Sequence, residues 1–187
     1  AIDFFILSKL EANGIRPSKE ADPQTLMRRL HLDVTGLPPG VDTVRKFAES
    51  ENPLNYQQTV DSLIADEGFG ERLSVHWLDL VRYADTVGYH GDQPYSVWPY
   101  RDYVINAFNK NMPFDQFTLE QIAGDLVPNP TRSQKVASGF NRLHMITAEG
   151  GAQDKEYLAK YAADRVRATS GVWLGATMGC AECHDHK

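Results

Sequence analysis

The spacing of hydrophobic side chains constrains the fold of this chain more than any other feature, because it follows the α-helical period almost throughout. The clearest stripe lies in residues 70–84, where one helical face carries Leu73, Trp77, Leu80, Val81 and Ala84. No stretch of useful length alternates apolar and polar residues as a half-buried strand would. The sequence therefore predicts an all-α fold.

Prolines and glycines divide the chain into separate helices. We expect one helix at residues 3–12, and a second that is capped by Asp22, begins at Pro23 and stops at Gly36. Further helices are expected at 42–50, 54–66, 70–84, 99–110, 115–125 (capped by Asp115), 131–142 and 154–173. Long connections at 86–97 and 147–153 break the periodicity, so the expected architecture is an irregular multi-helix domain with long ordered loops.

Length and charge narrow the possible roles. The 187 residues suit a single domain spanning 1–187. The net charge of −6 argues against a nucleic-acid-binding protein, which would show a basic face. The sequence contains no run of 18 apolar residues, so it does not predict a membrane-spanning helix. Because the chain begins at Ala1 and ends directly after a cysteine motif, we expect it to be a piece of a longer polypeptide.

The strongest chemical signal is Cys180-Ala181-Glu182-Cys183-His184, which contains both cysteines of the chain. Two thiols in a C-x-x-C-H motif can form thioethers with the vinyl groups of one haem, and the histidine can then bind the iron. This interpretation predicts a covalent haem c at Cys180 and Cys183, with His184 as an axial ligand, and a role in electron transfer or another redox step.

Other interpretations of the motif remain open. Cys180, Cys183, His184 or His186 and one further residue could hold zinc in a binding or scaffolding module, although no second ligand pair follows at the usual spacing. The two cysteines could also form a local disulfide or a redox-active dithiol. The simplest alternative is a pair of surface cysteines without a function.

The second axial ligand of the iron is harder to assign. His186 and Met178 lie too close to His184 in sequence to reach the opposite haem face easily. His144 and Met145 are better candidates, followed by His76 and His90, yet a lone His or Met on a helix more often serves packing. Another part of the intact protein could fill this position, or it could stay open for a small ligand or peroxide chemistry.

Many ordered segments of this chain resemble the planctomycete cytochrome-associated domain of unknown function, the PSCyt type. The matching segments include Asp33–Pro39, His76–Asp79, Arg82–Asp85, Trp98–Asn109, Glu120–Leu126, Gly139–Arg142, Glu149–Gly151, Asp164–Val166, Trp173–Gly175 and Cys180–Lys187. Together they cover nearly the whole chain.

The resemblance implies a part of a large exported bacterial protein, beside a separate cytochrome c domain. It implies that Cys180, Cys183 and His184 attach the haem if the family carries one. Because haem is attached to this motif outside the cytoplasm, it further implies a periplasmic or other extracytoplasmic location. The expected partners are the other domains of the polypeptide and a redox protein. The resemblance does not imply an enzymatic activity. The sequence also lacks serine or cysteine nucleophile signatures, a phosphate-binding loop and a zinc-protease motif.

Two further groups of residues invite a functional interpretation. Arg82, Arg101, Arg142 and Arg165 could pair with haem propionates, although salt bridges to nearby aspartates are at least as plausible for each. Residues 85–102 gather aromatic and charged side chains that could line a ligand site. We favour a structural role there, with Trp98 and Tyr100 as anchors and Arg101 paired to Asp85 or Asp102.

Overall fold

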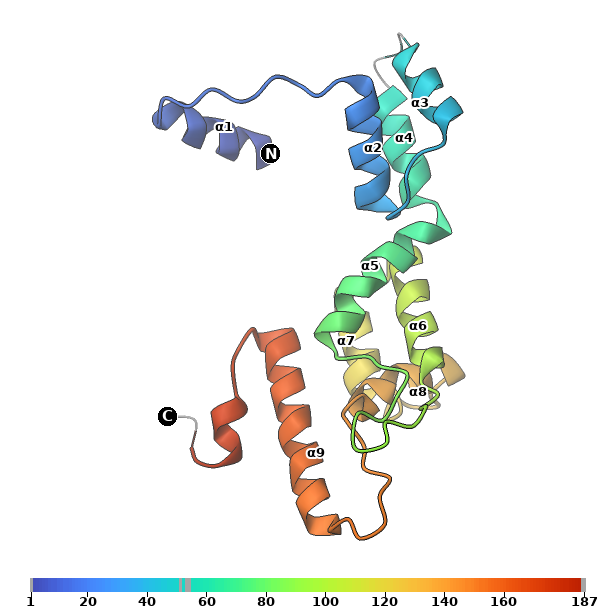
Figure 1. The fold of residues 1–187 in the computed structure, drawn as a ribbon, viewed down its shortest axis with the longest axis vertical. Coiled ribbons are helices and arrows are strands. Elements are labelled where there is room, and N and C mark those ends of the chain that lie inside the picture. The colour runs from blue at the N-terminus through green and yellow to red at the C-terminus, as the bar shows by residue number, and fades with distance from the viewer. Residues whose placement is uncertain (1, 51, 53–54, 186–187) are drawn as a thin grey trace. The chain divides into compact units, whose positions relative to one another are not determined.

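The computed structural model describes residues 2–50, 52 and 55–185, and within these it consists of helices without a strand (Figure 1). The all-α prediction is therefore confirmed. The α-helices are α1 (Ile2–Ala12), α2 (Pro23–Val34), α3 (Val41–Ala48), α4 (Asn55–Ile64), α5 (Glu67–Leu80), α6 (Trp98–Asn109), α7 (Phe114–Ala123), α8 (Arg132–Ala137) and α9 (Asp154–Thr169). Three short helices of other types complete the set: η1 (Ser138–Arg142), η2 (Ser170–Leu174) and η3 (Gly179–Glu182).

The helices group into two compact units. The first unit takes in the chain up to Asp33 together with Leu37–Val60, and the second takes in Val34–Gly36 and the chain from Asp61 onward. In the first unit, Met27 and Leu30 of α2 are buried, whereas no residue of α1 is. The prediction that residues 1–187 form one domain stays a prediction.

Local capping explains several helix starts. Asp22 accepts a hydrogen bond from the backbone N–H of Thr25 (2.9 Å), as predicted for the start of α2. Thr131 and Gln134 form a reciprocal capping box at the start of α8. The predicted cap at Asp115 is wrong, because α7 begins at Phe114 after Pro113 and Asp115 lies within its first turn.

Helix α5 differs from its predicted span at both ends. It begins at Glu67, and Asp66 caps it by accepting a hydrogen bond from the N–H of Gly68 (2.8 Å). The sequence did not predict this start, because two glycines lie in the first turns. It ends at Leu80, although apolar residues continue at helical spacing to Ala84. Arg82 takes a left-handed backbone conformation (φ 61°), which no α-helix can contain.

The core of the second unit lies where α5, α6 and α7 meet the later helices. Its buried apolar residues are Val81, Tyr100, Tyr103, Val104, Ala107, Phe117, Ala137, Phe140, Leu143 and Ala168. Helices α5 and α6 pack along each other (Figure 1). They approach so closely at Gly70 that its N–H donates to Asn109 Oδ1 across the interface (2.7 Å).

The last part of the chain returns toward α9. The predicted helix 154–173 is α-helical only to Thr169 and then widens into a π-type turn over Ser170–Leu174. Gly175 follows in a left-handed conformation (φ 57°), which terminates the helix. This reversal brings the short helix η3 against α9.

Candidate functional site

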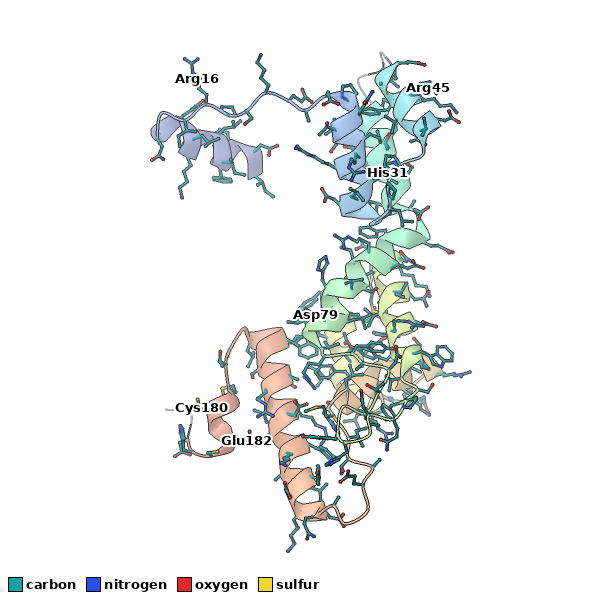
Figure 2. The ribbon with its side chains drawn as sticks, viewed as in Figure 1. Arg16, His31, Arg45, Asp79, Cys180 and Glu182 are labelled. Atoms are coloured by element: carbon teal, nitrogen blue, oxygen red, sulfur yellow. The ribbon has the colours of Figure 1, made fainter. Side chains whose placement is uncertain are left out.

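The cysteine motif begins on a single 3₁₀ turn beside α9. Figure 2 shows Cys180 and Glu182 on η3, the short helix next to α9. Arg167 of α9 forms an ion pair with Glu182 (2.5 Å), and its other terminal nitrogen lies 3.9 Å from Asp164. The second variable residue of the C-x-x-C motif therefore ties the cysteine segment to the helix.

The chemistry of the motif is accessible. Cys180 and Cys183 are both free thiols and both exposed. His184 is exposed as well, and its Nδ1 is hydrogen-bonded to the carbonyl oxygen of Asp185 (2.6 Å). A carbonyl acceptor places the ring proton on Nδ1, so Nε2 is left with a lone pair that can bind a metal ion.

A groove of about 650 Å³ runs between α9 and the cysteine segment. It is lined by Glu156, Ala159, Lys160, Ala162, Ala163, Val166, Arg167, Met178, Gly179, Ala181, Glu182 and Cys183. The three alanines form a small apolar strip on the α9 side of the groove, next to charged residues of the same helix. Lys160 and Arg167 supply positive charge, each in an ion pair with a glutamate. The volume lies within the range of pockets that hold cofactors and small ligands.

His144 lies on the other side of α9 from this groove. Its ring stacks on Tyr161 (centroids 4.4 Å apart), and its Nε2 lies 3.1 Å from a terminal nitrogen of Arg165. Tyr161 and Arg165 occupy the helical face opposite Ala159 and Ala163, which line the groove. The structure therefore does not bring His144 together with the cysteine motif.

Hydrogen bonding also defines the state of His144. Its Nδ1 donates to the carbonyl oxygen of Met145 (2.8 Å), and its Nε2 then accepts from Arg165. Burial lowers the pKa of His144 below its ordinary value of 6.5, against the opposing effect of the Met145 carbonyl. A neutral imidazole with both nitrogens engaged has no lone pair left for an iron.

The other sequence candidates are also separate from the motif or outside the described residues. Met145 packs against Gly88, where an added Cβ would lie 2.7 Å from its Cγ. His90 pairs with Glu149 (3.1 Å) and contacts the Tyr157 hydroxyl (3.3 Å). His76 is exposed on α5, Met178 is half-buried in the groove lining, and His186 lies outside the described residues.

The described residues contain neither a metal-ligand cluster nor a membrane-spanning helix. Over residues 2–50, 52 and 55–185, no group of three or more His, Cys, Asp or Glu side chains is arranged to hold a metal ion. In the same ranges, no helix combines the length and apolar character that crossing a bilayer requires.

Of the four arginines that the sequence suggested as propionate partners, three form interactions within the described part of the fold and one does not. Arg82 pairs with Asp164 (2.7 Å), Arg101 pairs with Asp102 (3.3 Å), and Arg165 donates to the carbonyl oxygen of Asn141 (2.9 Å). Arg142 is exposed and forms no hydrogen bond or ion pair within the described part of the chain. Only Arg142 of the four is thus uncommitted.

Residues 85–102 serve mainly to anchor their own loop. Tyr100 is buried (3% exposed) at the start of α6, as expected for an anchor, whereas Trp98 is about half exposed (51%) and anchors little. The pairing of Arg101 with Asp102 agrees with the structural interpretation. Asp92 accepts a hydrogen bond from the N–H of Gly88 (2.8 Å) and thereby closes the loop tip.

Sequence reasoning missed a buried polar cluster formed by Trp77, Tyr100 and Gln121. Gln121 is fully buried, and its Oε1 accepts from the Tyr100 hydroxyl (2.5 Å) and from the Trp77 indole (3.1 Å). Burial raises the pKa of Tyr100 far above its usual range. These residues lie on three different helices, so no local pattern in the sequence could have revealed them.

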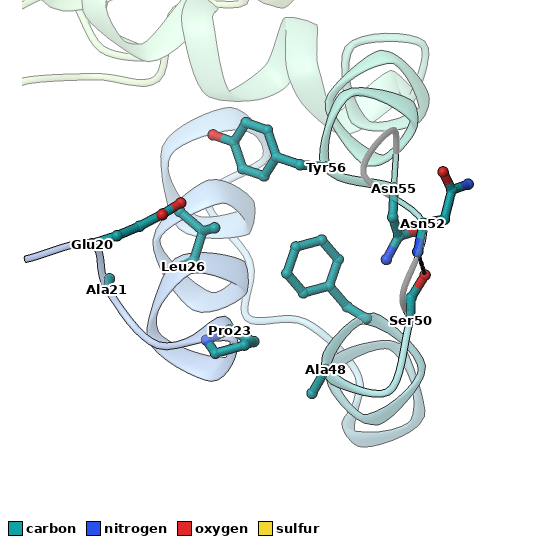
Figure 3. A pocket seen from close by; sticks show the side chains of 10 residues that line it. Glu20, Ala21, Pro23, Leu26, Ala48, Ser50, Asn52, Asn55 and Tyr56 are labelled. Carbon is teal, nitrogen blue, oxygen red and sulfur yellow. Dashed lines mark hydrogen bonds between the residues drawn. The ribbon is translucent and has the colours of Figure 1, made fainter.

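A second groove, of about 670 Å³, lies within the first unit (Figure 3). Leu26 of α2, Phe47 of α3 and Tyr56 of α4 contribute its larger side chains. Of the residues that line this groove, Glu20 and Tyr56 have ionisable side chains. This composition suits packing between α2, α3 and α4.

Comparisons with known proteins give one result. A family model described as "PSCyt2: Protein of unknown function (DUF1549)" matches residues 1–187. No curated protein and no solved structure matches the chain.

Proposed function

Since the chain belongs to the PSCyt2 family of proteins of unknown function over residues 1–187, we propose for it a role that the family description leaves open. It is an extracytoplasmic domain that carries haem c covalently at Cys180 and Cys183, with His184 as an axial ligand. It serves electron transfer, or a redox step shared with neighbouring domains of a longer protein. Its electron-transfer partner is a separate redox protein or one of those domains.

One observation carries this proposal: the C-x-x-C-H motif presents its reactive groups in usable form. Both thiols are free and exposed, so a maturation enzyme could reach them. The Nδ1 of His184 is held by the Asp185 carbonyl, which leaves Nε2 for the iron. An orienting hydrogen bond of this kind on a metal-binding imidazole is a usual companion of metal ligation.

The groove beside the motif supports a flat apolar cofactor. Ala159, Ala162 and Ala163 give its α9 side a strip of small apolar groups. Lys160 and Arg167 border it with cations, and a propionate would take the place of the glutamate that each now pairs with. When bound, haem supplies one-electron redox chemistry, and the surrounding chain adjusts its potential through burial and hydrogen bonds.

The decisive experiment is secretion of the protein with a working haem c maturation system. We expect a Soret band, a pyridine haemochrome spectrum, and haem that stays with the protein during acid–acetone extraction. The double variant C180A/C183A is expected to lose all covalent haem, since both attachment atoms are removed. H184A should change the spectrum of whatever haem is attached, because it removes an iron ligand.

His76→Ala is the matched control for H184A, because His76 is an exposed histidine outside the groove. Its spectrum should equal that of the wild type. Colourless wild-type protein, obtained although a reference cytochrome matures in the same cells, would overturn the proposal. Metal analysis of that colourless protein would then test the zinc alternative directly.

A further inference from the structure

A separate cavity lies in the second unit, between the loop that follows α5 and the segment that precedes α9. Its volume is about 240 Å³. Among the residues that line it are Arg82, Gly88, Arg142, Leu143, His144 and Asp164. None of them lines the groove beside the cysteines, so this cavity is independent of the proposed haem site.

The charges around the cavity favour an anion. Two arginines face it, Arg82 and Arg142, against a single carboxylate, that of Asp164. Asp164 is already satisfied by Arg82 (2.7 Å) and by the more distant Arg167 (3.9 Å). His144 adds no positive charge there, because burial lowers its pKa.

The two arginines also have unused donors. The Nη2 of Arg82 binds Asp164, but its Nη1 is buried without any hydrogen-bond partner in the described chain. A buried guanidinium N–H without an acceptor is costly and calls for an explanation such as a missing ion or water. Arg142 has no partner among the described residues either.

One residue of the cavity wall is held in a costly backbone conformation. Arg82 is left-handed (φ 61°), which is uncommon for a residue other than glycine. The loop is tied to the opposite wall by the hydrogen bond from the N–H of Ile146 to the carbonyl of Val87 (2.8 Å). Such strain persists where surrounding structure imposes it, and it concentrates at ligand sites.

We propose that this cavity binds a small oxyanion, a carboxylate or a tetrahedral sulfate or phosphate group, between the guanidinium groups of Arg82 and Arg142. Arginine forks match the oxygen spacing of these groups and form charge-assisted hydrogen bonds to them. The Arg82 side chain lines the cavity and is about one third exposed (35%), so its guanidinium lies within reach of a ligand there while Nη2 stays on Asp164. The bound anion then supplies the acceptor that Nη1 lacks.

The test uses the full chain at constant ionic strength, with chloride as the reference salt. Sodium phosphate, sodium sulfate and sodium acetate are titrated separately, and the backbone amide signals of Gly88 and Leu143 are followed by NMR. We expect at least one of the three anions to shift both signals in a saturable manner. The identity of that anion distinguishes a tetrahedral from a carboxylate ligand.

Two variants localise the binding. Arg142→Gln removes an exposed, unpaired guanidinium and should weaken the anion affinity about tenfold or more. Arg132→Gln is its matched control, because Arg132 is also exposed but does not line the cavity, and it should change the affinity less than twofold. Absence of saturable shifts with all three anions, or equal loss of affinity in both variants, would overturn the proposal.

Discussion

At the residue scale, the hydroxyl of Tyr100 is the clearest case of a polar group that the fold must satisfy. It donates to Gln121 (2.5 Å) and lies 3.1 Å from the indole nitrogen of Trp77; Tyr100 and Gln121 are buried, and Trp77 is partly buried. Gln121 is fully buried, so its side chain cannot find water in place of the hydroxyl if the hydroxyl is removed. The cluster therefore makes the packing of α5, α6 and α7 specific.

Tyr100→Phe should lower the free energy of unfolding of the second unit by about 1–3 kcal/mol, since Gln121 would keep a buried acceptor with one partner fewer. Tyr89→Phe is the control, because the Tyr89 hydroxyl forms no hydrogen bond in the described chain. Urea unfolding followed by tryptophan fluorescence measures the effect, since Trp77, Trp98 and Trp173 all belong to this unit. Equal stabilities of the two variants would contradict the prediction.

His144 predicts a pH dependence of stability. Its pKa is lowered in the folded chain by burial, so the unfolded chain takes up a proton first as the pH falls through 6.5. Stability is fully present above that value and decreases with acidification, because the unfolded state then binds more protons. The free energy of unfolding should therefore fall between pH 7.5 and 5.5.

His144→Asn should reduce this slope, whatever its effect on stability at pH 7.5. His76→Asn, at an exposed position on α5, should leave the slope as in the wild type. The same fluorescence-monitored urea titrations, repeated across the pH range, give both slopes. An unchanged slope in H144N would show that this imidazole does not carry the effect.

At the element scale, the crossing of α5 and α6 depends on the absence of a side chain at Gly70. A Cβ built there would lie 2.6 Å from the backbone carbonyl oxygen of Ile105, and 2.5 Å from the Asn109 side chain. A backbone carbonyl within a helix cannot yield without moving the helix. The two helices would have to separate to accommodate even one methyl group.

Gly70→Ala should destabilise the second unit by about 1–3 kcal/mol through overpacking, although alanine favours helix by up to about 1 kcal/mol over glycine. Gly171→Ala provides the control, since nothing lies within 4 Å of a Cβ at that position. Thermal unfolding by circular dichroism compares them. A G70A protein as stable as G171A would show that the helices adjust freely.

Helix ends separate what local rules explain from what they do not. Asp22 caps α2 through a residue three positions away, and the sequence predicted this interaction correctly. Asp115 has the residue type of a cap, yet α7 starts one residue before it. The early end of α5 at Leu80 has no local signal, because its apolar spacing continues to Ala84.

At the scale of the whole molecule, a chain of charges links distant parts of the second unit. Arg82 pairs with Asp164 of α9, Arg167 lies near the same carboxylate, and Arg167 in turn pairs with Glu182 of the cysteine segment. Asp164 is only 22% exposed, so its interactions are less screened than those of surface pairs. The carboxylate thus connects the loop after α5 with the C-terminal segment.

Asp164→Asn should lower the free energy of unfolding by about 1–3 kcal/mol, because it leaves the half-buried Arg82 without its counter-charge. It should also speed proteolysis of the cysteine segment, which loses part of the support of Arg167. Glu156→Gln, which removes an exposed pair on the same helix, should cost much less, because exposed ion pairs contribute little to stability. Similar losses in both variants would exclude a special role for Asp164.

The sequence by itself determined the all-α class, the approximate place of each described α-helix, and the residues of the cysteine motif, but not the short helix η3. Helix formation and capping depend on neighbours three or four positions away, and the C-x-x-C-H spacing is likewise local. These features can therefore be identified without knowledge of the fold.

The tertiary structure alone decided which distant residues meet. It placed His144 across α9 from Cys183, closed the Tyr100–Gln121 cluster, and set Arg82 and Arg142 around one cavity. Such contacts join residues tens of positions apart, and they depend on how helix faces pack and which groups packing excludes from water. These contacts arise from the packing of side chains in three dimensions, and no pattern along the chain predicts them.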